Sequence, residues 1–154
     1  MRQRPVYVLN HSQHNFRKRT TQEDLDEIGD WTDRAARRMY EGAGLGPADV
    51  DIFNPYDGYA IMTQFYLEAF QWHGVKRGDA FAFYAGDIRV EGPHPFCSSG
   101  GNLGNGRIRL YTDSIEQLRG MAAARQVRVR AETALAAFTT PRSGGSIMFG
   151  KYPS

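Results

Sequence analysis

Apolar residues recur along this chain in two spacings, one typical of helices and one of strands. Trp31, Ala35 and Met39 lie on one helical stripe, and Asp30 precedes that stripe as a candidate N-cap. A second helix is expected after Gly58, and it should be largely buried because its apolar stripe is wide. The stripe consists of Ile61, Met62, Phe65, Tyr66, Ala69 and Phe70.

Short apolar runs between the expected helices predict strands. A third helix is expected at Asp113, whose spacing to Glu116 is that of a capping box. The alternation of strands and helices predicts an α/β fold, with one mixed sheet of about five strands and flanking helices, in a single domain over residues 1–154. The expected strands are Pro5–Leu9, Val50–Phe53, Ala80–Tyr84, Asp87–Glu91, Val127–Arg130, Thr133–Thr139 and Ser146–Phe149. The expected loops and turns are His11–Thr21, Gly92–Gly106 and Ser143–Gly145.

Composition narrows the class of protein. The chain has 154 residues, of which 41% are hydrophobic and 23% charged, as in ordinary globular domains. The net charge of +2 is too small to argue for nucleic acid. No apolar run is long enough for a membrane span or a signal peptide, so we expect a cytoplasmic protein without a membrane partner. Cys97 is the only cysteine, which excludes an intrachain disulfide and a cysteine zinc site, and we expect no metal.

Five segments resemble the thiolase superfamily, in its lipid-transfer-protein or sterol-carrier-protein-type branch. The first of these segments starts at Ala43 and reads AGLGPADVDIFNPYDGY. The resemblance as a whole covers nearly the whole chain, from Pro5 to Gly150. The segments that follow in family order are LEAFQWHG, SSGGNLGNGR, IEQLRGMAAARQV and SGGS. The resemblance implies a thiolase-like layered fold and, more narrowly, the C-terminal half of such a protein.

The resemblance also implies substrates and partners. The substrate would be an acyl-CoA thioester, with no separate cofactor. The first half of a thiolase carries the nucleophilic cysteine, so an N-terminal half, a partner subunit or a second copy of the chain would complete the site. Lipid-transfer-like proteins also act with a small partner built from a zinc ribbon and an oligonucleotide-binding fold. The chain would therefore be incomplete alone, or would be a fragment of a longer protein.

The resemblance places three candidate catalytic residues. Tyr56 takes the position of the asparagine in the family's N-E-A-F motif, where a phenol can donate to an oxyanion or transfer a proton. Arg107 aligns with the catalytic histidine; an arginine can hold an oxyanion or a phosphate but cannot act as a base. Ser143 lies at the last glycine-rich loop, where the family's base cysteine is absent. We expect these three residues to converge on one cleft.

Five further residues are candidates for substrate binding: Asp57, Gly100, Gly101, Gly144 and Gly145. The glycines permit sharp turns and close approach of the backbone to a ligand, or they form purely structural loops. Asp57 is alternatively an N-cap of the following helix. Cys97 lies beside this predicted site, where a lone cysteine is usually inert.

Two functions remain open at this point. The chain is either an enzyme half-site that makes or breaks a carbon–carbon bond beside a CoA thioester, or a non-catalytic acyl-CoA-binding or scaffold module. The missing histidine and cysteine favour an aldolase-like or degenerate thiolase chemistry over a classical Claisen condensation. The acyl group cannot be read from these residues.

Overall fold

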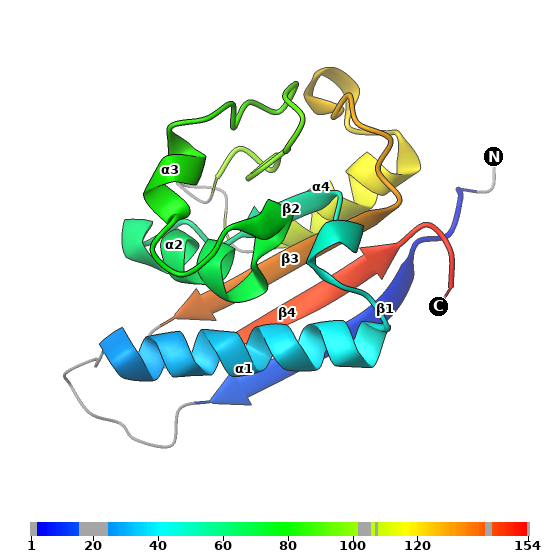
Figure 1. Cartoon of the computed structure of the whole chain (residues 1–154). Coiled ribbons are helices and arrows are strands. Elements are labelled where there is room, and N and C mark those ends of the chain that lie inside the picture. Colours follow the sequence, from blue (N-terminus) through cyan, green and yellow to red (C-terminus); the bar gives the residue numbers. More distant parts are fainter. Residues whose placement is uncertain (1–2, 16–24, 102–105, 107, 141–142, 154) are drawn as a thin grey trace.

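A computed structural model of the chain describes residues 3–15, 25–101, 106, 108–140 and 143–153. Its centre is one mixed sheet with the order β1-β4-β3-β2 (Figure 1). The strands are β1 (Tyr7–Asn15), β2 (Ile52–Pro55), β3 (Thr133–Thr140) and β4 (Ser143–Gly150). β2 runs parallel to β3, and the pairs β3–β4 and β4–β1 are antiparallel. This arrangement confirms the predicted α/β class with a mixed sheet.

Helices cover both faces of the sheet. On one face α1 (Leu25–Ala43) packs against β1, β4 and α2 (Ala60–Phe70). On the other face α4 (Ile108–Arg119) packs against β2, β3 and β4. The smaller elements are a five-residue helix, α3 (Ala80–Tyr84), and three 3-10 turns, η1 (Pro47–Asp49), η2 (Trp72–Gly74) and η3 (Ala123–Arg125). No helix within the described ranges is long and apolar enough to cross a membrane.

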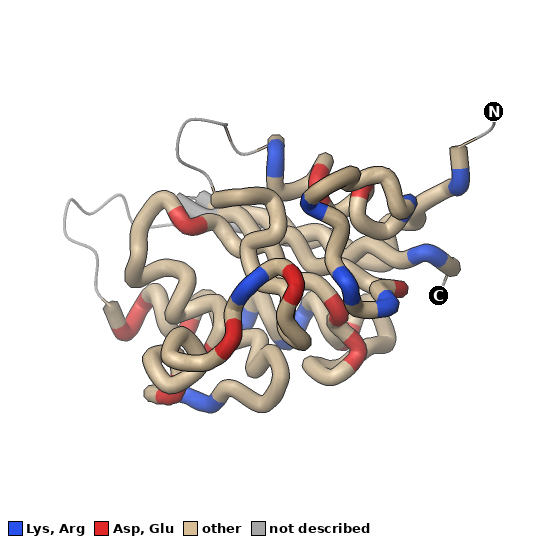
Figure 2. The backbone as a smooth tube through the Cα atoms, turned by 90° about the horizontal axis from the view of Figure 1, so that it is seen from above, with Lys and Arg blue, Asp and Glu red and all other residues tan. Residues whose placement is uncertain are grey.

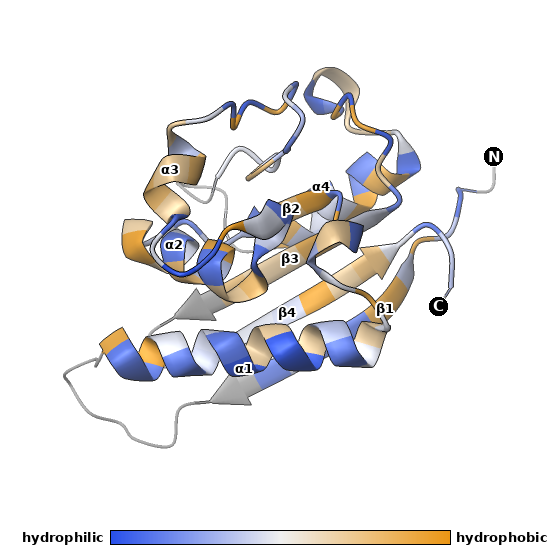
Figure 3. Cartoon of the chain, viewed as in Figure 1, coloured by the Kyte–Doolittle hydropathy of each residue, from blue (hydrophilic) through white to orange (hydrophobic). Residues whose placement is uncertain are grey.

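Each face of the sheet has its own hydrophobic cluster. Phe53, Leu135 and Met148 join the cluster under α1 and α2, whereas Ile52 and Phe149 join the one under α4. Neighbouring residues of a strand point to opposite faces, so the central strands are apolar on both sides (Figure 3). The sheet is therefore the shared middle layer of three.

β2 is the most enclosed strand. All four of its residues are buried, and both of its edges are occupied. β3 pairs with one edge, and the segment Pro95–Cys97 lies along the other through a single parallel bridge, Phe53 with Phe96. The sheet thus has four regular strands, and this single bridge occupies the position that a fifth strand beside β2 would take.

The predicted burial of the second helix is confirmed. Within α2, Met62, Tyr66 and Phe70 are buried and Phe65 is half-buried, while Ile61 at the first turn is exposed. The ring of Phe53 lies 5.5 Å from that of Phe70, centroid to centroid, which ties the helix to β2. A fully buried side chain of this size contributes roughly 2 kcal/mol.

Three predicted strands are wrong. Ala80–Tyr84 is the helix α3, because a short run of apolar residues suits either element and here packs as a helix against Phe96. Asp87–Glu91 is a turn, in which the Asp87 carboxylate accepts bonds from the backbone and side chain of Arg89. Val127–Arg130 joins no sheet, since the Val127 N–H donates to Gln117 Oε1 of α4.

Several predicted boundaries are also wrong. Residues His11–Asn15, expected in a loop, extend β1, because β4 supplies a pairing partner along their whole length. Asp30 is not an N-cap, since α1 starts at Leu25 and Ile28 begins its buried face. The turn expected at Ser143–Gly145 is the start of β4, paired with the end of β3.

Two stacked histidines lie at the edge of the core beside Trp72. The ring centroids of His73 and His94 are 3.9 Å apart, and His73 has the left-handed φ of +50° that few side chains adopt. Among described residues, the buried Nδ1 of His94 has no hydrogen-bond partner. Burial, and then repulsion from His94, lowers the pKa of His73 to about 4, although Asp51 opposes this.

Acid should therefore destabilise the fold through His73. Its folded pKa lies below that of the unfolded chain, so the unfolded state binds more protons between about pH 6.5 and 4, and stability falls as pH falls through this window. Because His73 is only partly buried and keeps solvent contact, solvent screening limits the loss to about 1 kcal/mol. His73→Asn, which tolerates the left-handed backbone, should flatten this part of the urea-unfolding profile against pH. Identical pH profiles for the two proteins would contradict the assignment.

Candidate functional site

Tyr56 lies at the edge of the sheet where two parallel strands end. Its backbone N–H donates to the Ala137 carbonyl of β3 at 2.7 Å. Its ring is buried and meets that of Phe138 edge-on, with centroids 5.3 Å apart. The carboxyl ends of parallel strands share one edge of a sheet, which is a common place for ligand sites.

The last glycine-rich segment starts at the same edge. In the register of β3 with β4, Gly145 pairs with Phe138, Gly144 with Thr139, and Ser143 with Thr140. The backbone of Ser143–Gly145 therefore begins β4, and β3 lies between it and Tyr56. Arg107 lies outside the described residues, so the convergence of Arg107 with Tyr56 and Ser143 stays a prediction.

The phenol of Tyr56 folds back over its own turn. A Cβ added at Gly58 would lie 2.2 Å from the Tyr56 hydroxyl oxygen, which is closer than the van der Waals contact of two non-bonded atoms allows. Glycine at this position therefore leaves room for the hydroxyl. The sequence reading missed this role of Gly58, which is visible only once the ring direction is known.

Asp57 does not cap α2. The N-cap of that helix is Tyr59, and no side chain bonds to the cap. Asp57 Oδ1 is buried and has no hydrogen-bond partner among the described residues. Its other oxygen, Oδ2, would lie 2.4 Å from a Cβ added at Gly101, which itself has a φ of +76°. Asp57 and Gly101 are thus in contact, and the carboxylate retains unused capacity to accept a hydrogen bond.

Cys97 lies beside Asp57 but lacks the properties of a nucleophile. Burial first, and then the Asp57 carboxylate, raises the pKa of the thiol well above its ordinary value. The thiolate is the reactive form of cysteine, so this thiol is unreactive near neutral pH. The geometry agrees with the inert role expected for Cys97.

A groove opens on the α4 face of the sheet, beside α4 itself. It has a volume of about 530 Å³, within the range of small-molecule sites. Apolar, polar and small residues line it, Gly144 and Gly145 among them, and Phe138 links it to Tyr56. The other lining residues are Val8, His11, Ser12, Gln13, Tyr111, Ser146 and Ile147.

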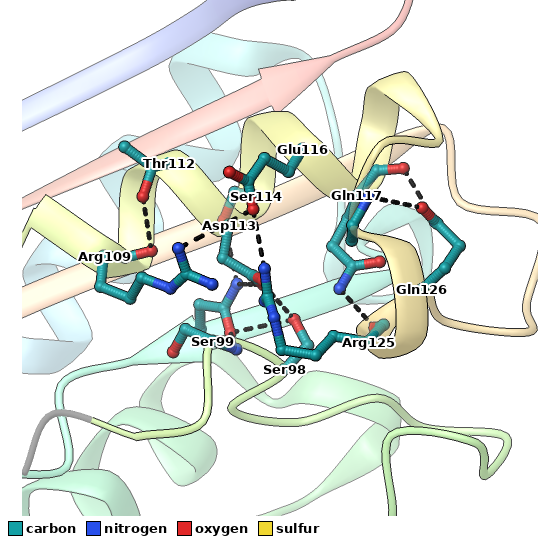
Figure 4. A network of polar contacts seen from close by, with 12 residues as sticks. Ser98, Ser99, Arg109, Thr112, Asp113, Ser114, Glu116, Gln117, Arg125 and Gln126 are labelled. Atoms are coloured by element: carbon teal, nitrogen blue, oxygen red, sulfur yellow. Dashed lines mark hydrogen bonds and ion pairs between the residues drawn. The ribbon is translucent and has the colours of Figure 1, made fainter. Parts of the chain in front are cut away.

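A buried polar network behind the site was not predicted. Asp113, expected as a helix cap, lies inside α4, which begins five residues earlier at Ile108, and it is fully buried. Asn54 of β2, Ser98 and Arg125 all donate to its carboxylate (Figure 4). A charged residue outside the apolar stripe of a helix normally lies on the solvated face. The buried role of Asp113 is therefore visible only from the packing of the structure.

Charge and metal-ligand patterns add little to the site. Acidic and basic residues lie interspersed over the described part of the chain (Figure 2). Within those same residues, no group of three or more histidine, cysteine or acidic side chains gathers as a metal site would require. The polar side chains that the structure places at this edge are those of Tyr56 and Asp57, beside the glycine-rich segments.

Comparison with known proteins decides the family. Residues 12–146 match the family model described as thiolase C-terminal domain-like. The chain belongs to this family. Sterol carrier protein 2 of Rattus norvegicus is 33% identical over 105 residues, which are 64% of this chain and 19% of that protein. An acetyl-CoA acetyltransferase of Methanothermobacter thermautotrophicus is 33% identical over 111 residues, which are 68% of this chain and 28% of that protein.

Solved structures share the fold of this thiolase C-terminal domain. An Ltp2-ChsH2(DUF35) aldolase superposes with a TM-score of 0.78 at 20% identity, over 97% of this chain and 40% of that one. A monomeric SCP2-thiolase-like protein from Mycobacterium smegmatis gives a TM-score of 0.66 at 13% identity, over 97% of this chain and 30% of that one. The chain thus spans less than half the length of each relative.

Contact between Gly101 and Asp57 can be tested in the thiolase C-terminal domain with two neighbouring glycines. Gly100 and Gly101 both have positive φ, so alanine at either position costs about 1 kcal/mol of backbone strain. A Cβ at Gly100 meets no described atom within 4 Å, whereas one at Gly101 collides with the Asp57 carboxylate. In urea unfolding, Gly101→Ala should lose at least about 1 kcal/mol more than Gly100→Ala. Equal losses would show that Asp57 does not lie against Gly101.

Proposed function

We propose that this thiolase C-terminal domain acts on acyl-CoA thioesters, in cleavage or formation of a carbon–carbon bond, together with an N-terminal half or partner subunit. The observation that carries the proposal is the buried ring of Tyr56, which follows β2, bonds through its backbone to Ala137 of β3, and lies at the edge where β4 starts. The family match and the names of the relatives, a sterol carrier protein, an acetyltransferase and an aldolase, support the substrate class.

The residues suit aldol chemistry better than a Claisen condensation. In aldol cleavage, a base removes the proton of a β-hydroxyl group. The bond between Cα and Cβ then breaks, which releases a carbonyl compound and forms the enolate of the shorter thioester. The enolate carbon then takes up a proton. Tyr56 would transfer a proton or donate to the oxyanion, and the free lone pairs of Asp57 Oδ1 would orient a hydroxyl group.

The remaining candidates take supporting roles in this proposal. Gly144 and Gly145 start β4 at the edge of the sheet that Tyr56 occupies, where glycine lets a substrate approach the backbone closely. Gly100 and Gly101 shape the neighbouring loop. Ser143 and Arg107 would complete the polar lining, Arg107 by holding an oxyanion or a phosphate. The reaction needs no cofactor beyond the CoA thioester itself.

Loss of the Tyr56 hydroxyl should abolish the chemistry while preserving the fold. With a complementary N-terminal half present, Tyr56→Phe should lower the rate of acyl-CoA cleavage by about 100-fold or more, as loss of a general acid or base typically does. The matched control is Tyr152→Phe, an exposed tyrosine near the C-terminal end of the described residues, which should keep full activity.

Activity in Tyr56→Phe equal to that of Tyr152→Phe would refute the catalytic role of the phenol. If an acyl-CoA binds but is not turned over, even with an N-terminal half present, that result would favour a non-catalytic role. In that case the domain is a non-catalytic acyl-CoA-binding or scaffold module of a thiolase-like or aldolase complex.

The groove beside α4 supports the proposed need for a partner. α4 packs against β2, β3 and β4, while the groove lies over β1 and β4 on the same face. Val8, which lines the groove, is 57% exposed, and small residues in its lining would admit a closely packed helix. We assign this surface to an N-terminal thiolase half or to a second copy of the chain. A small partner with a zinc ribbon and an oligonucleotide-binding fold would bind elsewhere on the assembly.

A charge in the groove should weaken this association. Val8→Glu should reduce self-association, or affinity for an N-terminal half, by about tenfold or more, because the carboxylate would be buried without a partner. Phe81→Glu is the control, since Phe81 is an exposed apolar residue on α3, on the other side of the sheet. Sedimentation equilibrium and titration calorimetry measure both effects. Equal effects of the two variants would remove the groove as the docking surface.

A further inference from the structure

The segment that carries Gly101 is fixed to the sheet residue by residue. The Cys97 N–H donates to the Phe53 carbonyl at 2.9 Å, and the Gly100 N–H donates to the Cys97 carbonyl at 2.9 Å. Between them, the Ser99 N–H donates to Asn54 Oδ1 at 3.2 Å. Gly101, the next residue, then meets Asp57. The position of this segment therefore decides where the Asp57 carboxylate can lie.

Asp113 is the main side-chain partner of this segment, beside Asn54, whose Oδ1 also lies 3.2 Å from the Ser98 hydroxyl. The Ser98 hydroxyl donates to Asp113 Oδ2 at 2.6 Å, and Asn54 Nδ2 donates to the same oxygen at 3.2 Å. Arg125 of η3 donates to the other oxygen, Oδ1, and pairs outward with Glu116 at 2.8 Å. Asp113 is fully buried and Ser98 is 1% exposed, so water does not replace these bonds. Figure 4 shows the carboxylate between the segment and η3.

We propose that Asp113 is a positioning residue of the site, which holds the Ser98–Gly101 segment against β2 and thereby sets Gly101 against Asp57. The inference rests on the proposed function only for its effect on catalysis; the positioning itself is a property of the fold. Asp113 acts through Ser98 and Asn54. The charge of Arg125 compensates that of the buried carboxylate, whose desolvation would otherwise be costly.

An amide cannot take the place of this carboxylate. Both oxygens of Asp113 accept from donors: Arg125 on one side, Ser98 and Asn54 on the other. Asn at position 113 has one acceptor and one NH₂ group, so in either orientation the NH₂ group faces an obligate donor, Arg125 on one side or Asn54 Nδ2 on the other. The Ser98 hydroxyl can reverse and accept from the amide, because Asn54 Oδ1 is a second acceptor for its proton, but Asn54 Nδ2 cannot. One side of the network must therefore open, and the position of the segment depends on which side it is.

The single cysteine of the chain reports on this segment directly. Cys97 directly precedes the Ser98–Gly101 segment, and its thiol is half-buried in the intact fold. Reaction with the chromogenic disulfide 5,5′-dithiobis(2-nitrobenzoate), under conditions where the chain stays folded, measures local opening. Asp113→Asn should raise the reaction rate about tenfold or more, and Ser98→Ala, which removes one hydroxyl but leaves Asp113 bonded to Asn54 and Arg125, should raise it by a smaller factor.

Two controls separate local opening from general destabilisation. Glu116→Gln removes the outer partner of Arg125 but no bond to the segment, so the Cys97 rate should stay within about twofold of wild type. Ile28→Val weakens the core under α1, far along the chain from the segment, and should lower stability without raising the Cys97 rate in proportion. If Asp113→Asn does not fold, Ser98→Ala carries the test.

The outcomes distinguish this inference from the proposed function. A Cys97 rate unchanged in Asp113→Asn and Ser98→Ala, or raised equally in Ile28→Val, would overturn the positioning role. With an N-terminal half and acyl-CoA present, Ser98→Ala should lower kcat more than it raises KM, because the segment orients groups around the reacting atoms. If Tyr56→Phe is fully active while the Cys97 rates behave as expected, the proposed chemistry fails and the positioning role stands.

Discussion

The enclosure of β2 is the constraint on which the rest of this structure depends. Its four residues are buried, β3 pairs with one edge, and Pro95–Cys97 lies along the other. The chain turns out of the sheet directly after it, at Tyr56, so that residue and Asp57 inherit a fixed position. A strand that has no freedom to shift is a suitable base for a site whose groups must meet at hydrogen-bonding distance.

Polar side chains make this buried arrangement specific. Asn54 is fully buried within β2 and bonds to the Ser99 backbone, to Ser114 and to Asp113. Such a network costs desolvation energy, and it tolerates only one arrangement of its donors and acceptors. Apolar packing alone would allow the loop at residues 97–101 to settle in several places. The network thus links the core under α4 to the geometry around Asp57.

Helices and strands with a strong pattern of apolar residues could be predicted from the sequence, and those with a weak pattern could not. The stripe of α2 is periodic and the apolar runs of β2, β3 and the later part of β4 are continuous, and these parts lie where the sequence indicated. Ala80–Tyr84 has no period that separates helix from strand, so packing against Phe96 decided it. The polar half of β1 gives no signal of its own, because its pairing depends on β4, more than 120 residues later in the chain.

The sequence by itself determined the family, the α/β class and the identity of the candidate groups at Tyr56, Asp57 and the glycine-rich segments. Those features lie in local motifs and periodic patterns that need no distant partner. Only the tertiary structure decided that Asp57 is not a cap, that Gly58 leaves room for a phenol, and that Asp113 is buried among donors. The physical reason is that the environment of a polar side chain depends on how the chain packs: Asp113 meets Ser98 and Asn54, 15 and 59 residues earlier, only once the chain has folded, and Tyr56 meets Gly58 only through the direction of its ring.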